Sequence, residues 1–348
     1  MRKDFITERN SNIELLRIFA ICTIILSHVM GGGKELSGVN QFLTIALNSL
    51  FHAGAGTTCF MLITGYFGAK ISPYRLVRLW LIVEICSLAT TTFSIFINDG
   101  SVLALAKAAI PITTKKYWYA SCYFYTLLLS PFLNMAVDRL EKSAYRKLLM
   151  LLILLFYAFP TFLYYDIIGD KGKGLVHMVI AYFIGRYMAL FSEKHALKRI
   201  KFFLCCVMIM SLFGNIVATY IRKITSWPFS RECTITTLLI AVCCLIIAVK
   251  QTEHNIKLVN LVAKYVFPVY LLNNSIIGYV KSVFDYSAFY SESWYIGLCI
   301  LIAGIVFVTS FIISIPILKI ADGLTSFLCS ILSKSKIKSK VILLIKNI

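Results

Sequence analysis

The chain has 348 residues, of which 59% are hydrophobic and only 15% are charged, and its formal net charge is +19. A water-soluble domain has about 25% charged residues, so this composition excludes a protein whose surface lies wholly in water. The excess of Lys and Arg does not indicate nucleic-acid binding, because the basic residues lie in short connectors between apolar stretches. We attribute it to orientation in a membrane and to attraction toward anionic lipid.

Ten apolar stretches approach the length needed to cross about 30 Å of hydrocarbon. In chain order they are expected at residues 13–30, 42–67, 74–97, 118–137, 148–165, 175–191, 202–221, 234–249, 258–280 and 294–319. The connectors are short, so we expect an all-α polytopic membrane protein with a single membrane-embedded domain at 1–320. Residues 321–348 mix Ser and Lys with Ile, Leu and Val, and they are expected to form a basic cytoplasmic tail at the membrane interface.

The distribution of Lys and Arg supports this layout. Of the 35 basic residues, 24 fall on one side of the predicted membrane and 10 on the other, and Arg17 lies inside the first span. Cytoplasmic connectors carry the excess of Lys and Arg in membrane proteins. The sequence therefore predicts that both termini lie in the cytoplasm.

The 11 cysteines lie mostly inside the apolar stretches, where Cys behaves as a small hydrophobe. The sequence has no CxxC pair and no Cys/His ligand spacing, so we expect neither a metal site nor a disulfide framework. The polar first dozen residues are not followed by a small-x-small pattern, so a cleaved signal peptide is not expected either.

Polar side chains at membrane depth are costly and usually have a partner or a function, and the first span is rich in them. Glu14, Arg17 and His28 fall within about 60° of one another on one helix face. Glu14 and Arg17 are spaced to form an i,i+3 ion pair, and His28 lies about 16 Å further along the helix. The set is either a functional stripe or an ion pair at a helix end with a separate interfacial His.

Basic residues gather again before the third span. Lys70, Arg75 and Arg78 lie within nine residues, which suits a polyanion such as a phosphate-bearing cofactor, although the positive-inside rule alone also accounts for them. Glu84 lies about 9 Å deeper on another face. It is either a functional carboxylate or the partner of a neighbouring helix. His52 precedes a run rich in Gly and Thr, most of which we expect to serve close helix packing.

Taken together, these segments resemble the acyltransferase-3 family of integral membrane proteins, bacterial enzymes that O-acylate cell-surface sugars. The resemblance starts with RNSNIELLRI at 9–18, which opens an apolar run ending at His28. It continues with CFMLITGYF at 59–67 and RLVR at 75–78. It extends through the segment 117–134, which begins YWY and ends LSPFLN, to VYLLN at 269–273.

The chain departs from the family pattern at two positions. Thr64 stands where the family often has Ser, and it keeps the hydroxyl. Asn273 stands where the family often has His, which removes a titratable group, so we assign Asn273 no acid–base role. The secondary candidate site positions are His52, Glu84, Trp118, Tyr270 and Asn273.

The resemblance implies transfer of an acyl group, with acetyl as the expected group, from cytosolic acyl-CoA to a glycan or a lipid-linked sugar. Acyl-CoA is then a donor substrate, and no permanently bound cofactor is expected. The protein would be a multi-pass protein of the bacterial inner or plasma membrane, with a role in O-acetylation of an exopolysaccharide, capsule or O-antigen.

The same resemblance gives the polar residues roles. Arg75 and Arg78, with Lys70, would hold the CoA phosphates. Arg17 would assist them or position the thioester, and Glu14 would orient or neutralise Arg17. His28 is the expected general base toward the sugar hydroxyl, since an imidazole titrates near neutral pH, and an acyl-His intermediate is the alternative.

The main alternative from another class is a transporter or flippase of lipid-linked sugars. Intramembrane charges suit a transporter, but we expect no paired broken helices at matching positions of two halves. A glycan polymerase or ligase is disfavoured by the lack of a long outer loop. A membrane scaffold would leave the polar residues of the first span without a purpose.

Overall fold

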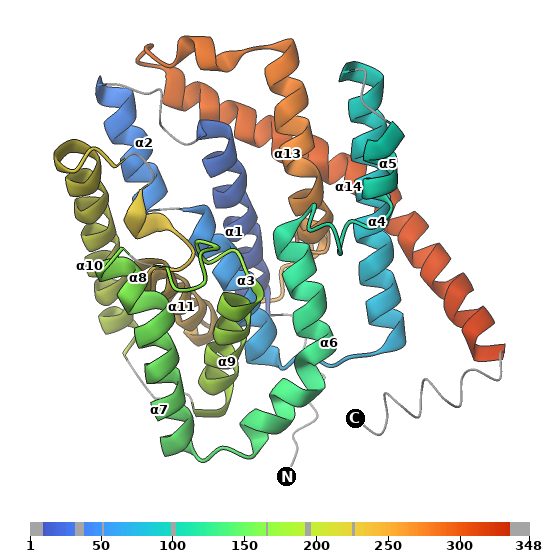
Figure 1. The fold of residues 1–348 in the computed structure, drawn as a ribbon, viewed down its shortest axis with the longest axis horizontal. Helices are drawn as coiled ribbons and strands as arrows, with labels where there is room; N and C mark the ends of the chain where they lie inside the picture. The colour runs from blue at the N-terminus through green and yellow to red at the C-terminus, as the bar shows by residue number, and fades with distance from the viewer. Residues whose placement is uncertain are drawn as a thin grey trace.

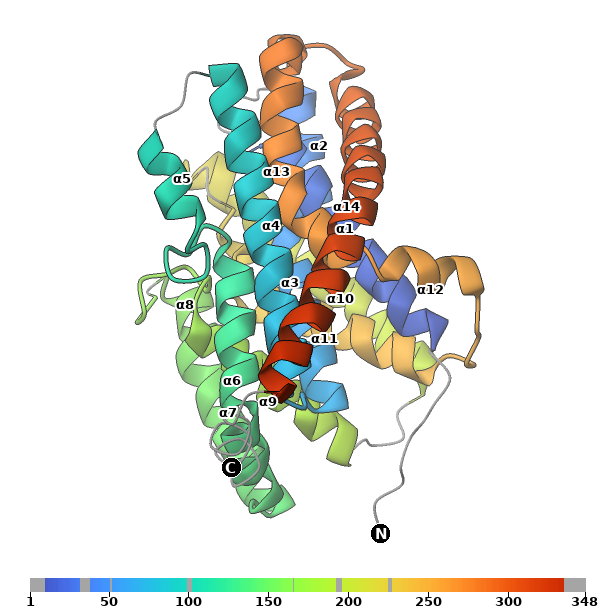
Figure 2. The same cartoon turned by 90° about the vertical axis from the view of Figure 1, so that its right-hand side faces the viewer.

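The computed structural model describes residues 10–31, 38–50, 52–98, 102–164, 166–191, 196–224 and 227–334. These residues form a helical bundle, and no strand occurs among them. Most of the long helices run along one common direction, and both views place the start of the first helix and the end of the last toward the same end (Figures 1 and 2). The prediction of an all-α polytopic membrane protein is confirmed.

The chain forms fourteen α-helices and four short π- or 3₁₀-helical turns within the described residues. The first half contains α1 (Ser11–Met30), α2 (Gly38–Leu50), α3 (Ala53–Phe67), α4 (Pro73–Asn98), α5 (Val102–Ala108), α6 (Trp118–Asp138), α7 (Lys142–Ile153), the π-helical turn η1 (Leu154–Ala158) and α8 (Phe159–Phe162). The second half contains α9 (Leu175–Phe191), α10 (Leu197–Ile216), the π-helical turn η2 (Val217–Ile221), the 3₁₀ turn η3 (Pro228–Ser230), α11 (Ile235–Lys250), α12 (Lys257–Ala263), α13 (Val266–Val283), the 3₁₀ turn η4 (Tyr286–Phe289) and α14 (Tyr295–Lys334).

Eight helical segments of the described chain are long and apolar enough to span a membrane. They correspond to eight of the ten predicted spans. The other two are α9, an apolar helix of 17 residues, and α13, an 18-residue helix whose hydropathy is lowered by Asn273, Asn274 and Lys281. Ten helical crossings therefore fit the structure, two of them shorter or more polar than a standard span.

Two predicted spans are interrupted. The span expected at 42–67 is broken between α2 and α3, where His52 caps α3 by accepting from the Ala55 N–H at 3.0 Å. The span expected at 258–280 is broken between α12 and α13. Pro268 lacks the N–H that a continuous helix would direct to the carbonyl four residues earlier, and its ring disfavours helix there. The interruptions fall in the second and ninth spans, which are not matching positions of two five-span halves.

The last helix extends further than predicted. The span was expected to end at 319, but α14 continues as a 40-residue helix to Lys334, past Pro316. The division between a membrane domain at 1–320 and a tail at 321–348 thus falls inside a helix. That division stays a prediction, and residues 335–348 lie outside the described part of the chain.

Helix α3 lies at the centre of the bundle, packed against α1, α9 and α11. Its contact with α9 depends on two glycines. A Cβ atom at Gly65 would lie 2.1 Å from the Tyr182 carbonyl oxygen, and one at Gly185 would lie 2.1 Å from the Leu62 carbonyl oxygen. Small residues permit such close backbone approach between helices in lipid. The position of α3 matters because its end forms part of the site described next.

Candidate active site

A cavity of about 490 Å³ opens where α1, α4 and α7 begin and α3 ends, which we call the basic end of the bundle. It lies between α1, α3, α4, α6 and α13. Five cationic side chains line it, and they come from two helices and two connectors: Arg17, Lys70, Arg75, Arg78 and Lys264. Bringing so many positive charges together is unfavourable unless an anion binds among them or nearby carboxylates neutralise them.

Carboxylates neutralise only two of these cations. Arg17 donates from Nη1 to both Glu14 oxygens, at 2.8 and 3.0 Å, and Arg78 Nε donates to Asp322 Oδ1 at 2.6 Å. The other three, Lys70, Arg75 and Lys264, have no ion-pair partner within the described residues. The cavity therefore keeps an excess of positive charge, and it is suited to a polyanion.

The turn that carries Lys70 and Arg75 is built by local sequence. Gly68 follows α3 with a φ of 66°, a conformation that glycine adopts without strain. Ser72 Oγ then accepts from the Arg75 N–H at 3.2 Å, and Pro73 starts α4. Arg75 Nη1 donates back to the Lys70 carbonyl at 3.2 Å. These contacts direct both cations toward the same opening.

A closed ring of hydrogen bonds fixes this turn to the rest of the bundle. The Ala69 N–H donates to the Tyr182 hydroxyl at 3.1 Å, that hydroxyl donates to Asn134 Oδ1 at 2.7 Å, and Asn134 Nδ2 donates to the Ala69 carbonyl at 3.0 Å. Asn134 is on α6 and Tyr182 on α9, so the ring joins two helices to the end of α3. Each of the three residues both donates and accepts within the ring, which favours a rigid rim.

Aromatic rings line the deeper part of the cavity. Tyr119 stacks on Tyr123 with ring centroids 6.2 Å apart, and it meets Tyr270 edge-on at 5.5 Å. Phe60 packs against Tyr119 at 6.1 Å, and Phe267 against Tyr123 at 6.2 Å. The cavity is thus charged at its mouth and aromatic further in, which suits a ligand with an anionic head and an apolar or flexible arm.

His28 lies one helical turn beyond this aromatic wall, next to α13. Its Nδ1 atom is 3.0 Å from Asn273 Oδ1, and Asn273 is fully buried. Tyr270, three residues before Asn273 on α13, lines the cavity. The pair His28–Asn273 therefore adjoins the cavity on the side away from the basic end.

The chain was compared with known protein families, curated proteins and solved structures. A family model described as an acyltransferase domain, that of the acyltransferase-3 family, matches residues 10–318. The chain belongs to the acyltransferase-3 family. No curated protein and no solved structure matches the chain. The protein is thus a multi-pass membrane acyltransferase by family and by fold.

In this acyltransferase the residues predicted for donor binding come together. Lys70, Arg75 and Arg78 line one cavity with Arg17, which the sequence placed 53 residues before the nearest of them. The Glu14–Arg17 ion pair forms at i,i+3 as the spacing predicts. Their roles stay predictions.

The secondary candidates of the acyltransferase lie at different distances from this cavity. Tyr270 lines it, and Trp118 packs edge-on against Tyr119, with centroids 5.9 Å apart, just outside the wall. Glu84 lies deeper on α4, and its Oε2 atom is buried without a hydrogen-bond partner among the described residues.

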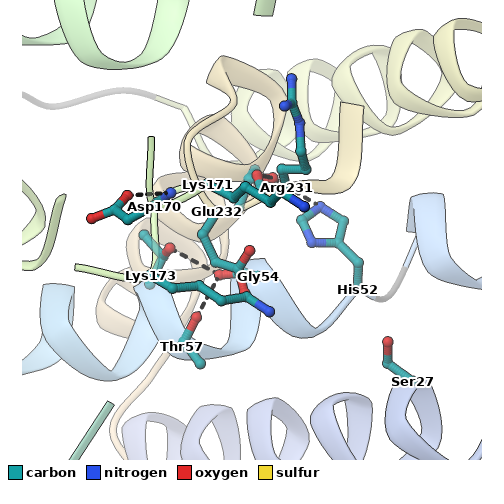
Figure 3. A network of polar contacts seen from close by, with 12 residues as sticks. Ser27, His52, Gly54, Thr57, Asp170, Lys171, Lys173, Arg231 and Glu232 are labelled. Carbon is teal, nitrogen blue, oxygen red and sulfur yellow. Dashed lines mark hydrogen bonds and ion pairs between the residues drawn. The ribbon is translucent and has the colours of Figure 1, made fainter. Parts of the chain in front are cut away.

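His52 does not line the cavity and lies at the break between α2 and α3, at the end of α3 away from the cavity. Its Nδ1 atom caps α3 and its Nε2 atom is 3.4 Å from Thr237 Oγ1. Figure 3 shows it among polar groups that include Lys173 and Glu232, whose charged atoms are 3.8 Å apart. Since both ring nitrogens have partners in this buried network, the structure gives His52 a clear structural role at the break between α2 and α3.

Sequence reasoning missed three contributors to the site. Lys264 was counted only among the 24 basic residues on the cytoplasmic side. The signal available in the sequence was Pro268 four residues later, which indicates a helix break near this lysine. Asp322 was assigned to the predicted tail, yet it pairs with Arg78. Asn134 was quoted only as the end of a family segment, and the ring that it forms with Tyr182 had no signal in the sequence.

Proposed function

We propose that this acyltransferase moves an acyl group, with acetyl as the expected group, from cytosolic acyl-CoA to a hydroxyl of a glycan. The acceptor is a cell-surface polysaccharide or a lipid-linked sugar of the bacterial plasma membrane, and no cofactor is held permanently. The observation that carries the donor assignment is the single cavity with five cations at its mouth and tyrosines within. Family membership supports a transferase over the alternative transporter.

The dimensions of the site support a CoA thioester as donor. Arg17 and His28 are 11 residues apart on α1, so they are separated by about 16 Å along the helix axis. A donor whose phosphates bind the cations must reach that far to bring its reacting carbon to His28. Acyl-CoA has this form, because a long flexible arm joins its phosphates to the thioester.

In the proposed reaction His28 acts as general base. Its unprotonated ring nitrogen takes the proton of the sugar hydroxyl while the oxygen attacks the thioester carbonyl carbon. The carbon–sulfur bond breaks, the sulfur leaves as the CoA thiolate, and the imidazolium returns the proton to that thiolate. The products are the acylated sugar and free CoA. An acyl-His intermediate is the alternative course and would place the acyl group on the same ring.

Donor binding is tested most cleanly at Arg75, because this cation has no carboxylate partner within the described residues. Arg75→Ala removes one charge-assisted contact, worth about 1.5–3 kcal/mol, so the Kd for acetyl-CoA should rise about 10- to 100-fold. Arg75→Lys should restore only part of the loss, because an ammonium lacks the planar fork. Binding is measured on the purified protein by calorimetry.

Arg146→Ala is the matched control. Arg146 is also an exposed arginine near the basic end, in α7, but it does not line the cavity. Unchanged binding in an Arg75→Ala, Arg78→Ala double variant would contradict donor binding at this cavity. The acceptor class is tested separately, since deletion of the gene should remove one acyl mass from a surface glycan in mass spectrometry.

A further inference from the structure

The amide of Asn273 has only one orientation that satisfies its neighbours. Its Nδ2 group donates to the Tyr270 carbonyl, which can only accept. Its Oδ1 atom therefore faces Nδ1 of His28 at 3.0 Å. Rotating the amide by half a turn would direct its oxygen at the Tyr270 carbonyl oxygen and lose that hydrogen bond. The backbone of α13 thus determines which atom Asn273 presents to α1.

This orientation determines which ring nitrogen of His28 carries the hydrogen. An amide oxygen accepts hydrogen bonds and cannot donate, so Nδ1 of His28 must carry the hydrogen. In the neutral ring the other nitrogen, Nε2, then holds a lone pair. Nε2 has no hydrogen-bond partner among the described residues, and the His28 side chain is only partly buried. It is left available to a substrate hydroxyl.

We propose that Asn273 is a positioning residue that holds His28 in the Nδ1-protonated tautomer, so that Nε2 is the atom that accepts the proton from the acceptor hydroxyl. This inference rests on the proposed function for its catalytic meaning. The tautomer itself follows from the contacts of Asn273 alone. Asn273 supplies a neutral hydrogen-bond acceptor beside the base.

Asn273 suits this role because it is fully buried and neutral. A carboxylate at the same place would stabilise the imidazolium and hold the proton that the base must release. The charged side chain whose field reaches His28 is Lys173, from the connector before α9, and Lys173 is itself paired with Glu232 (Figure 3). The other polar groups bonded to this part of α1 are Asn48, whose Oδ1 atom accepts from Ser27 Oγ, and the Tyr286 hydroxyl, which donates to the Val29 carbonyl.

The tautomer can be observed directly by nitrogen NMR on protein labelled with ¹⁵N in its His rings. The His28 signals are assigned by their loss in His28→Gln. We expect a protonated, pyrrole-type Nδ1 and an unprotonated, pyridine-type Nε2 at a pH where the ring is neutral. A pyridine-type Nδ1 would overturn the proposal whatever the protein's activity, while a protein that shows the expected signals but acylates nothing would contradict the proposed function alone.

Activity gives the second readout. Asn273→Leu should convert the ring to a mixture of tautomers and lower acyl transfer about 10- to 100-fold, the effect that the loss of such a hydrogen-bond partner has on metal-binding histidines. Asn273→Asp should retain the tautomer, but it should move the acid limb of the pH–rate profile about 1–3 pH units higher, since an adjacent carboxylate favours the imidazolium. Acetyl-CoA binding should stay unchanged in both.

Asn274→Leu is the matched control, because the neighbouring asparagine is exposed on the same helix. It should retain both the rate and the profile of the unaltered protein. An Asn273→Asp variant that transfers acyl groups with an unmoved acid limb would show that Asn273 serves packing alone, and would overturn the proposal.

Discussion

A methyl group added at Gly65 would clash with the backbone of α9. The added Cβ atom would lie 2.1 Å from the Tyr182 carbonyl oxygen, so the two helices would have to separate by about 0.9 Å to restore even a 3.0 Å contact. Overpacking of this kind costs about 1–3 kcal/mol or more, which exceeds the gain of about 1 kcal/mol from replacing Gly by Ala in a helix. Gly65→Ala should therefore destabilise the protein by up to about 2 kcal/mol.

The same separation of α3 and α9 should also disturb the rim of the donor cavity. Tyr182, against which the methyl group would press, also holds Ala69 and Asn134 in the hydrogen-bonded ring at the rim. We expect Gly65→Ala to lower the thermal unfolding midpoint in detergent and to weaken acetyl-CoA binding. Gly304→Ala on α14 is the control, because no atom lies within 4 Å of its added Cβ. Equal midpoints for the two variants would refute the packing argument.

Two further predictions concern the membrane topology of the termini and the contribution of Lys264 to donor binding. Reporter fusions should place both termini in the cytoplasm, as the excess of basic residues on one side requires, and an externally accessible C-terminus would show that a span has been miscounted. Lys264→Ala should raise the Kd for acetyl-CoA about tenfold, for the loss of one charge-assisted contact, while Lys257→Ala at the start of α12, outside the cavity, should leave it unchanged.

The helical architecture could be predicted because apolar length and charge distribution are properties of single segments. The ion pair Glu14–Arg17 was also predictable, because it forms within one helix turn. Contacts between helices could not be predicted. A helix in lipid is apolar on most faces, so its sequence gives little information about which face contacts which neighbour. The contact of His28 with Asn273 spans 245 residues, and no periodicity predicts it.

The breaks in the second and ninth spans show a second limit. Hydropathy continues through Phe51–His52 and through Lys264–Tyr265, so a window over residues predicts one helix in each case. The interruptions arise from local hydrogen bonding, the His52 cap in one and the missing N–H of Pro268 in the other. The second break places Lys264 in the cavity, which is why this cation was missed.

The central claim is that His28 deprotonates a glycan hydroxyl that attacks an acyl-CoA thioester. It is tested most directly by mass spectrometry of the surface glycan from a deletion strain that carries either the unaltered protein or His28→Gln, with acetyl-CoA binding measured on both purified proteins. Gln retains a polar, hydrogen-bonding side chain but cannot accept and release the proton near neutral pH. We predict normal binding with a loss of glycan acylation corresponding to a rate lower by about 10² to 10⁴. Near-normal acylation by His28→Gln would contradict the account.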